Sequence, residues 1–160
     1  MKLTIAAVGR LKAGPEKLLA DDYLKRAEGM GRKAGISAIR VQDFSESQAS
    51  SAAARMAEEA RILASAVPPR SFSIVLDERG KAVASEAFAG LMQRQLDHGT
   101  SDMTFVIGGP DGHAPETRER ADLLLSFGPM TWPHRLVRVM LFEQIYRAVT
   151  IMTGHPYHRA

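Results

Sequence analysis

The chain has 160 residues, of which 45% are apolar and 24% are charged, and this is the composition of an ordinary globular domain. It contains no cysteine, which excludes disulfides, thiolate metal sites and cysteine nucleophiles. No stretch approaches the roughly 20 consecutive apolar residues that span a bilayer, so we expect a cytoplasmic protein that does not enter a membrane.

The first part of the sequence alternates strand-like and helical patterns. Residues 2–8 form a mostly apolar run and residues 36–44 alternate apolar and polar side chains, so both predict strands. Pro15 is a favourable first residue for a helix over residues 15–28. The alanine-rich residues 46–67 predict a second helix, which the two prolines that follow would end.

The second part repeats this alternation. The patterns predict strands at residues 72–77 and 103–109, a helix at residues 85–97, a short helix after Pro115 and, beyond an irregular stretch, a long helix at residues 135–152. Strands that alternate with helices predict an α/β fold, with a mostly parallel sheet covered by helices on both faces in a single domain. In such sheets, ligands bind beyond the carboxyl ends of the strands.

The net charge of +3 is concentrated at the end of the sequence. Acidic and basic residues balance over residues 1–131, whereas residues 132–160 carry four arginines and a single glutamate. Positive charge gathered in one segment indicates a partner that carries phosphate groups. A chance imbalance of three charges is the alternative.

The predicted last helix is apolar on every side. A helix with this pattern has to be buried all round. The sheet of a small domain covers only one side, so we expect a second copy of the chain to cover the other in a two-fold dimer. Arg135 and Arg138 share one sector of this helix, and they either face a ligand or cap the rim of the core.

A glycine-rich segment, VIGGPDG, follows the predicted strand that begins at Met103. Its glycines, Gly108, Gly109 and Gly112, permit a positive φ and close approach of the backbone to a ligand. The spacing matches neither a Walker loop nor a Rossmann dinucleotide motif. A tight turn with no ligand is the alternative.

The segment LSFGPMTWPH precedes the last helix and has the glycine and prolines of an extended loop. Such a loop exposes backbone N–H and C=O groups, which suit the donor and acceptor edge of an adenine. The alternative is an ordinary connection that carries Trp132 at the surface.

The C-terminal segment contains His155, Tyr157, His158 and Arg159. Its two histidines match no common zinc spacing and have no acidic or thiol partner nearby, so a metal site is not expected. The same residues suit nucleic acid, because arginine binds phosphate, tyrosine stacks on a base and histidine moves a proton. The alternative is a frayed end without a role.

Taken together, these motifs resemble the RlmH family of SPOUT methyltransferases, which methylate N3 of a pseudouridine in large-subunit ribosomal RNA. The resemblance covers nearly the whole chain and is carried by the segments LDERGK (Leu76–Lys81), FVIGGPDG (Phe105–Gly112), LSFGPMTWPHRLVRVMLFEQIYRA (Leu125–Ala148) and HPYHR (His155–Arg159). It implies one SPOUT domain over residues 1–160, a C-terminal trefoil knot and dimer region over about residues 103–160, and a homodimer.

The resemblance also implies S-adenosyl-L-methionine as the methyl donor, S-adenosyl-L-homocysteine as its product, and no metal. Residues in three loops would hold the donor: Leu76, Gly108, Gly109, Phe127, Gly128, Pro129, Met130, Thr131, Trp132 and Pro133. The chain departs from the family pattern at Asp111, where the family often has glutamate, and the family varies at Trp132.

For catalysis, His134 and His158 are the candidates to take the proton of the pseudouridine nitrogen. Arg138 and Arg159 would bind the negative ring or a phosphate, and Tyr157 would stack on the base. We expect the C-terminal segment of one subunit to close over the donor held by the other, as a lid.

The resemblance implies the loop of helix 69 in 23S ribosomal RNA as the substrate, within the large subunit or the 70S ribosome. Two alternatives stay open. One is a SPOUT methyltransferase that acts on transfer RNA, and the other is a basic dimer that binds ribosomes without catalysis. A metal-dependent hydrolase that uses His155 and His158 is a third hypothesis, which a chelator would test.

Overall fold

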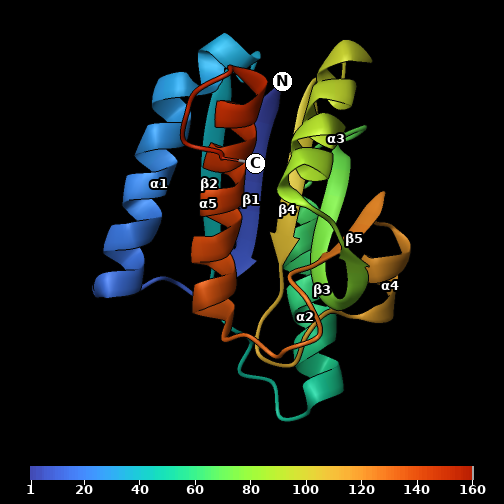
Figure 1. Ribbon diagram of the computed structural model, residues 1–160. Helices are drawn as coiled ribbons and strands as arrows, with labels where there is room; N and C mark the ends of the chain where they lie inside the picture. Colours follow the sequence, from blue (N-terminus) through green and yellow to red (C-terminus); the bar gives the residue numbers. More distant parts are fainter. Residues whose placement is uncertain (160) are drawn as a thin grey trace.

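The computed structural model describes residues 1–159. Within them a five-stranded sheet has the order β2-β1-β4-β3-β5, and every neighbouring pair is parallel (Figure 1). The strands are β1 (Lys2–Val8), β2 (Ala38–Phe44), β3 (Phe72–Ala82), β4 (Asp102–Ile107) and β5 (Leu123–Ser126). The predicted parallel α/β sheet is confirmed.

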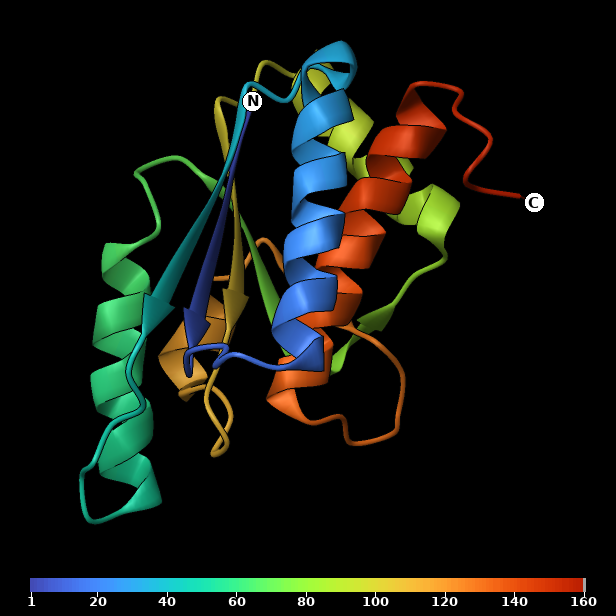
Figure 2. The same cartoon turned by 90° about the vertical axis from the view of Figure 1, so that its left-hand side faces the viewer.

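Helices cover both faces of this sheet, as predicted. They are α1 (Pro15–Gly31), α2 (Ala52–Ser65), α3 (Ser85–Asp97), α4 (Pro115–Glu119) and α5 (His134–Met152), with a short 3-10 turn η1 (Arg32–Ala34) after α1. The view of Figure 2 along the sheet shows α1, α3 and α5 on one face and α2 and α4 on the other.

The strands are buried on both sides because their side chains point alternately to the two helix layers. In β1, Leu3 and Ile5 belong to the large core under α1, α3 and α5, whereas Ala6 and Val8 belong to a smaller cluster under α2. The larger core therefore lies on the face that carries α5.

Several predicted bounds differ from the structure; β3, for example, continues to Ala82 instead of ending at residue 77. The second helix begins at Ala52 and not at residue 46, because Ser51 caps it: the Ser51 hydroxyl accepts a hydrogen bond from the Ala54 amide at 3.2 Å. The stretch before the last helix contains β5, a strand of only four residues that the sequence analysis left as irregular. Its pairing with β3 decides its conformation, and no local pattern shows that pairing.

The last helix is covered mainly by its own chain. α5 lies between α1 and α3 and against the sheet, and its buried side chains include Leu141, Phe142 and Ile145. Only part of its surface is left for a partner, including the exposed Leu136 and the partly exposed Val137. The part of the α5 surface that a second copy could cover is therefore smaller than the whole side that the sequence predicted.

The chain passes over itself where β3 meets β5. Leu125 of β5 pairs with Leu76 in the first part of β3 and also with Lys81 beyond an irregularity in the same strand. Between them Gly80 lies directly against the β5 backbone, since a Cβ at this position would be 2.7 Å from main-chain atoms of Leu124 and Leu125. A knotted path needs such a crossing. The complete trefoil knot stays a prediction.

Candidate functional site

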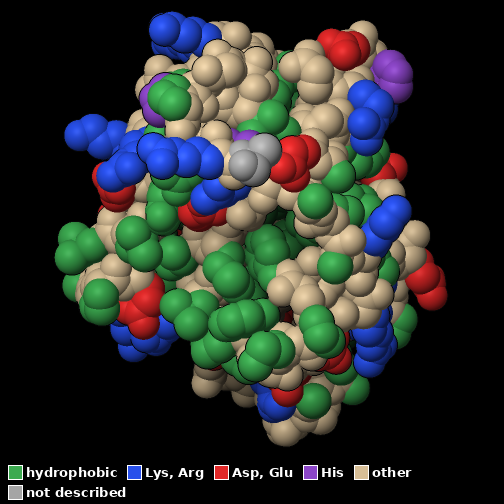
Figure 3. Space-filling view, in the orientation of Figure 1, with side chains coloured by type: hydrophobic (Ala, Val, Ile, Leu, Met, Phe, Trp, Pro, Cys, Tyr) green, Lys and Arg blue, Asp and Glu red, His purple; other side chains and the backbone are tan. Residues whose placement is uncertain are grey.

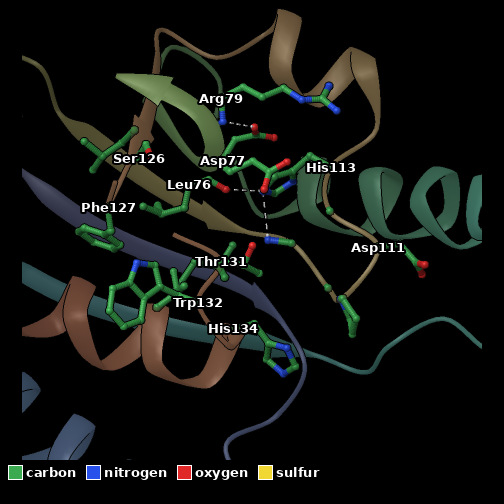
Figure 4. A pocket seen from close by; sticks show the side chains of 18 of the residues that line it. Leu76, Asp77, Arg79, Asp111, His113, Ser126, Phe127, Thr131, Trp132 and His134 are labelled. Carbon is green, nitrogen blue, oxygen red and sulfur yellow. Dashed lines mark hydrogen bonds between the residues drawn. The ribbon is translucent and has the colours of Figure 1, made fainter. Parts of the chain in front are cut away.

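A cavity of about 290 Å³ opens at the carboxyl ends of β4 and β5 and at residues 76–79 within β3 (Figure 4). Its walls come from segments far apart in the sequence, namely residues 76–79 at the bend in β3, residues 107–113 after β4, and residues 125–134 between β5 and α5. The strands are parallel, so their carboxyl ends meet at one edge and bring these segments together.

The cavity collects most of the residues predicted to hold a ligand. Those that line it are Leu76, Gly108, Gly109, Phe127, Gly128, Met130, Thr131 and Trp132. The remaining two predicted residues, Pro129 and Pro133, are not among its lining residues. The Pro133 carbonyl instead starts α5, accepting hydrogen bonds from the amides of Leu136 and Val137. We call residues 108–113 the glycine turn and residues 127–133 the knot loop.

His113 lines the cavity, and the sequence analysis did not single it out. The residue is only 4% exposed, and its Nε2 lies 3.0 Å from the Leu76 carbonyl and 3.1 Å from the Gly108 amide. Both contacts are drawn in Figure 4. One imidazole nitrogen therefore joins β3 to the segment after β4. The only signal in the sequence was a histidine just after a glycine-rich turn.

The structure explains two of the glycines differently from the sequence analysis. A Cβ on Gly108 would be 3.0 Å from the His113 ring, and a Cβ on Gly109 would be 2.7 Å from Oε2 of Glu59. Neither glycine has a positive φ, whereas Gly112 has φ 81. Gly108 and Gly109 are thus needed for close packing behind the cavity, and Gly112 is needed for the turn.

Helix α2 holds the glycine turn from outside the cavity. Arg55 makes a bidentate ion pair with Asp111, with Nε 2.7 Å and Nη2 3.0 Å from the two carboxylate oxygens. The Arg55 guanidinium lowers the pKa of Asp111 below its ordinary value. Asp111 is thereby fixed as an anion that anchors the turn, and a bidentate pair also fixes its orientation.

A second ion pair supports the opposite wall. Asp77, which is nearly buried, lies 3.5 Å from Arg118, and its other carboxylate oxygen accepts a hydrogen bond from the Arg79 amide at 2.9 Å. Arg118 also donates to the backbone carbonyl of His113. The α4 residue Arg118 thus links the bend in β3 to the end of the glycine turn.

The predicted catalytic residues on α5 lie in different surroundings. His134, the first residue of α5, lines the cavity, and its Nε2 lies 4.0 Å from a carboxylate oxygen of Glu46. Arg138 lies one turn further along α5 and is 2% exposed. It pairs with Asp43 at 2.8 Å and donates to the Gly9 carbonyl. Arg138 thus fastens α5 to the ends of β1 and β2, and its contact with substrate stays a prediction.

The C-terminal segment is anchored to its own chain and does not line the cavity. We call residues 153–159 the tail. Tyr157 packs on Tyr146, with ring centroids 4.6 Å apart, and its hydroxyl donates to Glu143 at 2.9 Å. Burial and hydrogen bonds with Tyr23 and Glu143 raise the pKa of Tyr157 well above its ordinary value, so it stays protonated.

The other predicted tail residues, His158 and Arg159, also lie outside the cavity of their own chain. His158 lies between α3 and α5, with Nε2 2.8 Å from Glu86 and Nδ1 3.3 Å from Arg147. Arg159 is exposed. None of the predicted tail residues lines the cavity of its own chain.

Comparison with known proteins identifies the family. A family model described as "Predicted SPOUT methyltransferase" matches residues 1–158. The chain is 54% identical over its full length to all of "Ribosomal RNA large subunit methyltransferase H" from Rhodopseudomonas palustris strain HaA2. It is 51% identical, again over its full length, to 99% of the protein of the same name from Bradyrhizobium sp. strain ORS 278.

The chain belongs to the SPOUT methyltransferase family, and within it to the RlmH family. The resemblance inferred from the sequence is confirmed. A solved structure, "The structure of a probable methylase family protein from Haemophilus influenzae Rd KW20", matches 99% of this chain and 70% of its own, with a TM-score of 0.50 and 11% sequence identity. That likeness supports the fold of this SPOUT methyltransferase.

Within residues 1–159, no group of three or more His, Asp or Glu side chains is arranged to hold a metal ion. No helix in that range has the length and apolar character to cross a bilayer.

The burial of His113 predicts that this SPOUT methyltransferase loses stability in mild acid. Burial lowers the pKa of His113 below its ordinary 6.5, and Arg118 lowers it further although Asp77 opposes them. The folded state then binds fewer protons than the unfolded state, so His113 contributes stability above pH 6.5 that is lost as the pH falls toward the folded pKa. Urea unfolding at pH 7.5 and 5.5 should show this loss for the natural chain and less of it for His113→Gln.

The exposed His98 provides the matched control for replacing a histidine by glutamine, because it lies at the surface and not in the core. An equal loss of stability in acid for His113→Gln and the natural chain would contradict the prediction.

Proposed function

We propose that this SPOUT methyltransferase transfers a methyl group from S-adenosyl-L-methionine to N3 of a pseudouridine in the helix 69 loop of 23S ribosomal RNA. The observation that carries the proposal is the cavity in which the bend in β3, the glycine turn and the knot loop converge. The name of the similar proteins, ribosomal RNA large subunit methyltransferase, supports the choice of substrate. The pseudouridine and its position rest on the motifs that resemble the RlmH family.

The residues of the cavity fit such a donor. Its volume of about 290 Å³ is near the lower end of the range of about 300–1,000 Å³ typical of small-molecule sites. Phe127 and Trp132 offer apolar surface for a flat ring, and the Leu76 carbonyl, which can accept a second hydrogen bond, offers an acceptor. When bound, the donor supplies an electrophilic methyl group on a sulfonium.

His134 is the residue of this chain that we propose to take the pseudouridine proton. It is the one predicted catalytic residue at the cavity, among those that the structure describes. The N3 nitrogen carries a proton that has to leave, so a base within reach accelerates the reaction. A carboxylate oxygen of Glu46 lies 4.0 Å from Nε2 of His134.

We further propose that two copies of the chain form the active enzyme, with residues 103–160 supplying the knot and the dimer contacts. Exposed apolar side chains gather on α1, the knot loop and the start of α5: Leu18, Leu19, Met130, Trp132 and Leu136. Figure 3 shows hydrophobic side chains collected over the lower half of this face. Leu18 is 73% and Met130 69% exposed, which is costly for a lone chain and is relieved by a partner.

The tail can then serve only a cavity of the second copy, because it does not line its own. We propose that Tyr157, His158 and Arg159 close over the donor held by the partner subunit, where they contact the base and a phosphate. The assembled large subunit or the 70S ribosome in the cytoplasm is the proposed substrate, and phosphate contacts would make the affinity fall with salt.

Calorimetry first tests binding of the donor product, and mass mapping of ribosomal RNA then tests the position of the methyl group. S-adenosyl-L-homocysteine should bind the purified protein with measurable heat, whereas a basic dimer that only binds ribosomes would give none. Ribosomal RNA from cells that lack the protein should gain one methyl group in the helix 69 loop after treatment with enzyme and donor. Methylation of transfer RNA, with ribosomal RNA left unchanged, would replace this proposal with the transfer RNA alternative.

A further inference from the structure

We propose that a groove between α2 and α4 is a second RNA-binding site of this enzyme, which holds a nucleotide of the RNA substrate away from the donor cavity. The groove has a volume of about 500 Å³ and lies on the face of the sheet opposite α5 (Figure 2). It shares none of its lining residues with the donor cavity. The inference rests on RNA as the substrate, which is part of the proposed function.

The groove combines a buried apolar floor with a positive edge. Leu63 of α2 and the strand residues Val75 and Val106 are buried at its floor. Three exposed arginines also line it, and none of them forms an ion pair with another residue in the range 1–159: Arg61, Arg70 and Arg120. A ligand that carries both a negative group and an apolar flat body matches these two surfaces.

Arg70 occupies a backbone position where a glycine would be less strained. The Ser71 amide donates to the Pro68 carbonyl at 3.0 Å, and Arg70 within this turn has φ 64. With Pro69 before it, Arg70 takes the third position of a type II turn, which favours glycine or asparagine. Among residues 1–159, Arg70 is the one residue other than glycine with a positive φ. Such strain is typical of a residue whose side chain serves a function.

The other polar groups of the groove are mostly paired within the fold. The Ser73 amide donates to the Asp122 carboxylate at 2.7 Å, and the Asp122 amide donates to the Ser73 carbonyl at 2.9 Å. The hydroxyls of Ser71 and Thr104 lie 2.8 Å apart and share a hydrogen bond. Of the two carboxylates that line the groove, Asp122 is thus held by the backbone, and the exposed Glu116 alone opposes three guanidinium groups. The groove therefore favours an anion.

A nucleotide of single-stranded RNA is the occupant that these surfaces fit best. Guanidinium groups bind its phosphate, and an unstacked base packs on an apolar or guanidinium surface. The short helix α4 separates the groove from the donor cavity, since Thr117 and Arg120 line the groove whereas Arg118 lines the cavity. One RNA strand that passes over α4 would contact both sites.

Replacing Arg70 by glycine separates binding from folding. Arg70→Gly relieves the strained φ, so the urea midpoint of unfolding should rise. The same variant should raise the KM for the large ribosomal subunit at least about threefold, with kcat and the affinity for S-adenosylhomocysteine unchanged, and should make the salt dependence of RNA binding less steep by about 0.7 in log–log slope. A turn without a ligand would give the higher midpoint and an unchanged KM.

Arg94→Gln is the control, because Arg94 is exposed in the last turn of α3, on the opposite face of the sheet. This substitution removes the same charge from the chain and should leave the KM unchanged. An equal rise in KM for both variants would show that only the overall charge matters, and it would overturn the inference.

Ultraviolet cross-linking of the natural enzyme to the large ribosomal subunit locates the RNA without any variant. Cross-linked peptides that contain residues 60–71 or 116–122 are the expected result. Cross-links confined to the donor cavity would overturn the inference and leave the proposed function standing. Tight binding of free adenosine monophosphate that does not compete with the large subunit would assign the groove to a free nucleotide and also overturn it. Absence of any RNA cross-link and of methyl transfer would overturn both proposals.

Discussion

Deletion of residues 157–160 is expected to reduce methylation of the ribosomal substrate to background while donor affinity changes by less than about threefold. The donor cavity is built from residues 76–79, 107–113 and 125–134, none of which belongs to the tail, so the truncated chain keeps it. The substrate contacts proposed for Tyr157, His158 and Arg159 would be lost. The measurements are calorimetry with S-adenosylhomocysteine and transfer of a labelled methyl group to the large subunit.

The deletion also removes contacts within the chain, so stability has to be measured beside activity. Loss of the Tyr157–Tyr146 contact and of the hydrogen bond to Glu143 should cost about 1–3 kcal/mol. Tyr157→Phe is the matched control, since it keeps the ring contact and loses only the hydroxyl. If the truncated enzyme still methylates ribosomes at the natural rate, the tail is no lid and acts only as a brace on α5.

A second control separates docking of the tail from its chemistry. Glu86 holds His158 at 2.8 Å but lies on α3, outside the cavity. Glu86→Gln should weaken this contact and leave turnover within about threefold of the natural enzyme. A loss as complete as that of the deletion would show that the position of His158 on its own chain is what activity requires.

The sequence predicted the sheet well because its strands carry local patterns. β1 and α3 have the predicted bounds, and the parallel arrangement follows from their alternation with helices. The glycine-rich loop of the cavity was also predictable, since it directly follows β4, and the glycine and prolines of the knot loop indicated an extended segment. Their convergence at one edge is a general property of parallel sheets.

The remaining features depend on pairings between residues far apart in the sequence. β5 is a short strand whose partner is β3, and the ion pair of Arg138 joins α5 to Asp43 at the end of β2. His113 contacts a carbonyl 37 positions earlier in the chain. No local spacing shows such contacts, so an arginine and a histidine next to a cavity could not be distinguished as structural or functional.

The crossing at Gly80 gives the largest expected effect on stability. In Gly80→Ala the added Cβ would meet main-chain atoms of Leu124 and Leu125 at 2.7 Å. Flexible side chains can move away from such contact, but these backbone atoms belong to β5, which pairs with β3 on both sides of the crossing. We expect a loss of at least about 3 kcal/mol in the free energy of unfolding, or failure to fold.

Gly29→Ala is the matched control for this substitution, measured by the same urea unfolding experiment. Gly29 lies exposed in α1, where a Cβ would meet nothing within 4 Å, and alanine should stabilise the helix by up to about 1 kcal/mol. If Gly80→Ala unfolds within about 1 kcal/mol of the natural chain, then β5 and the bend in β3 can separate without cost. In that case the crossing could not be a fixed part of the fold, and the predicted knot would lose the contact on which it depends.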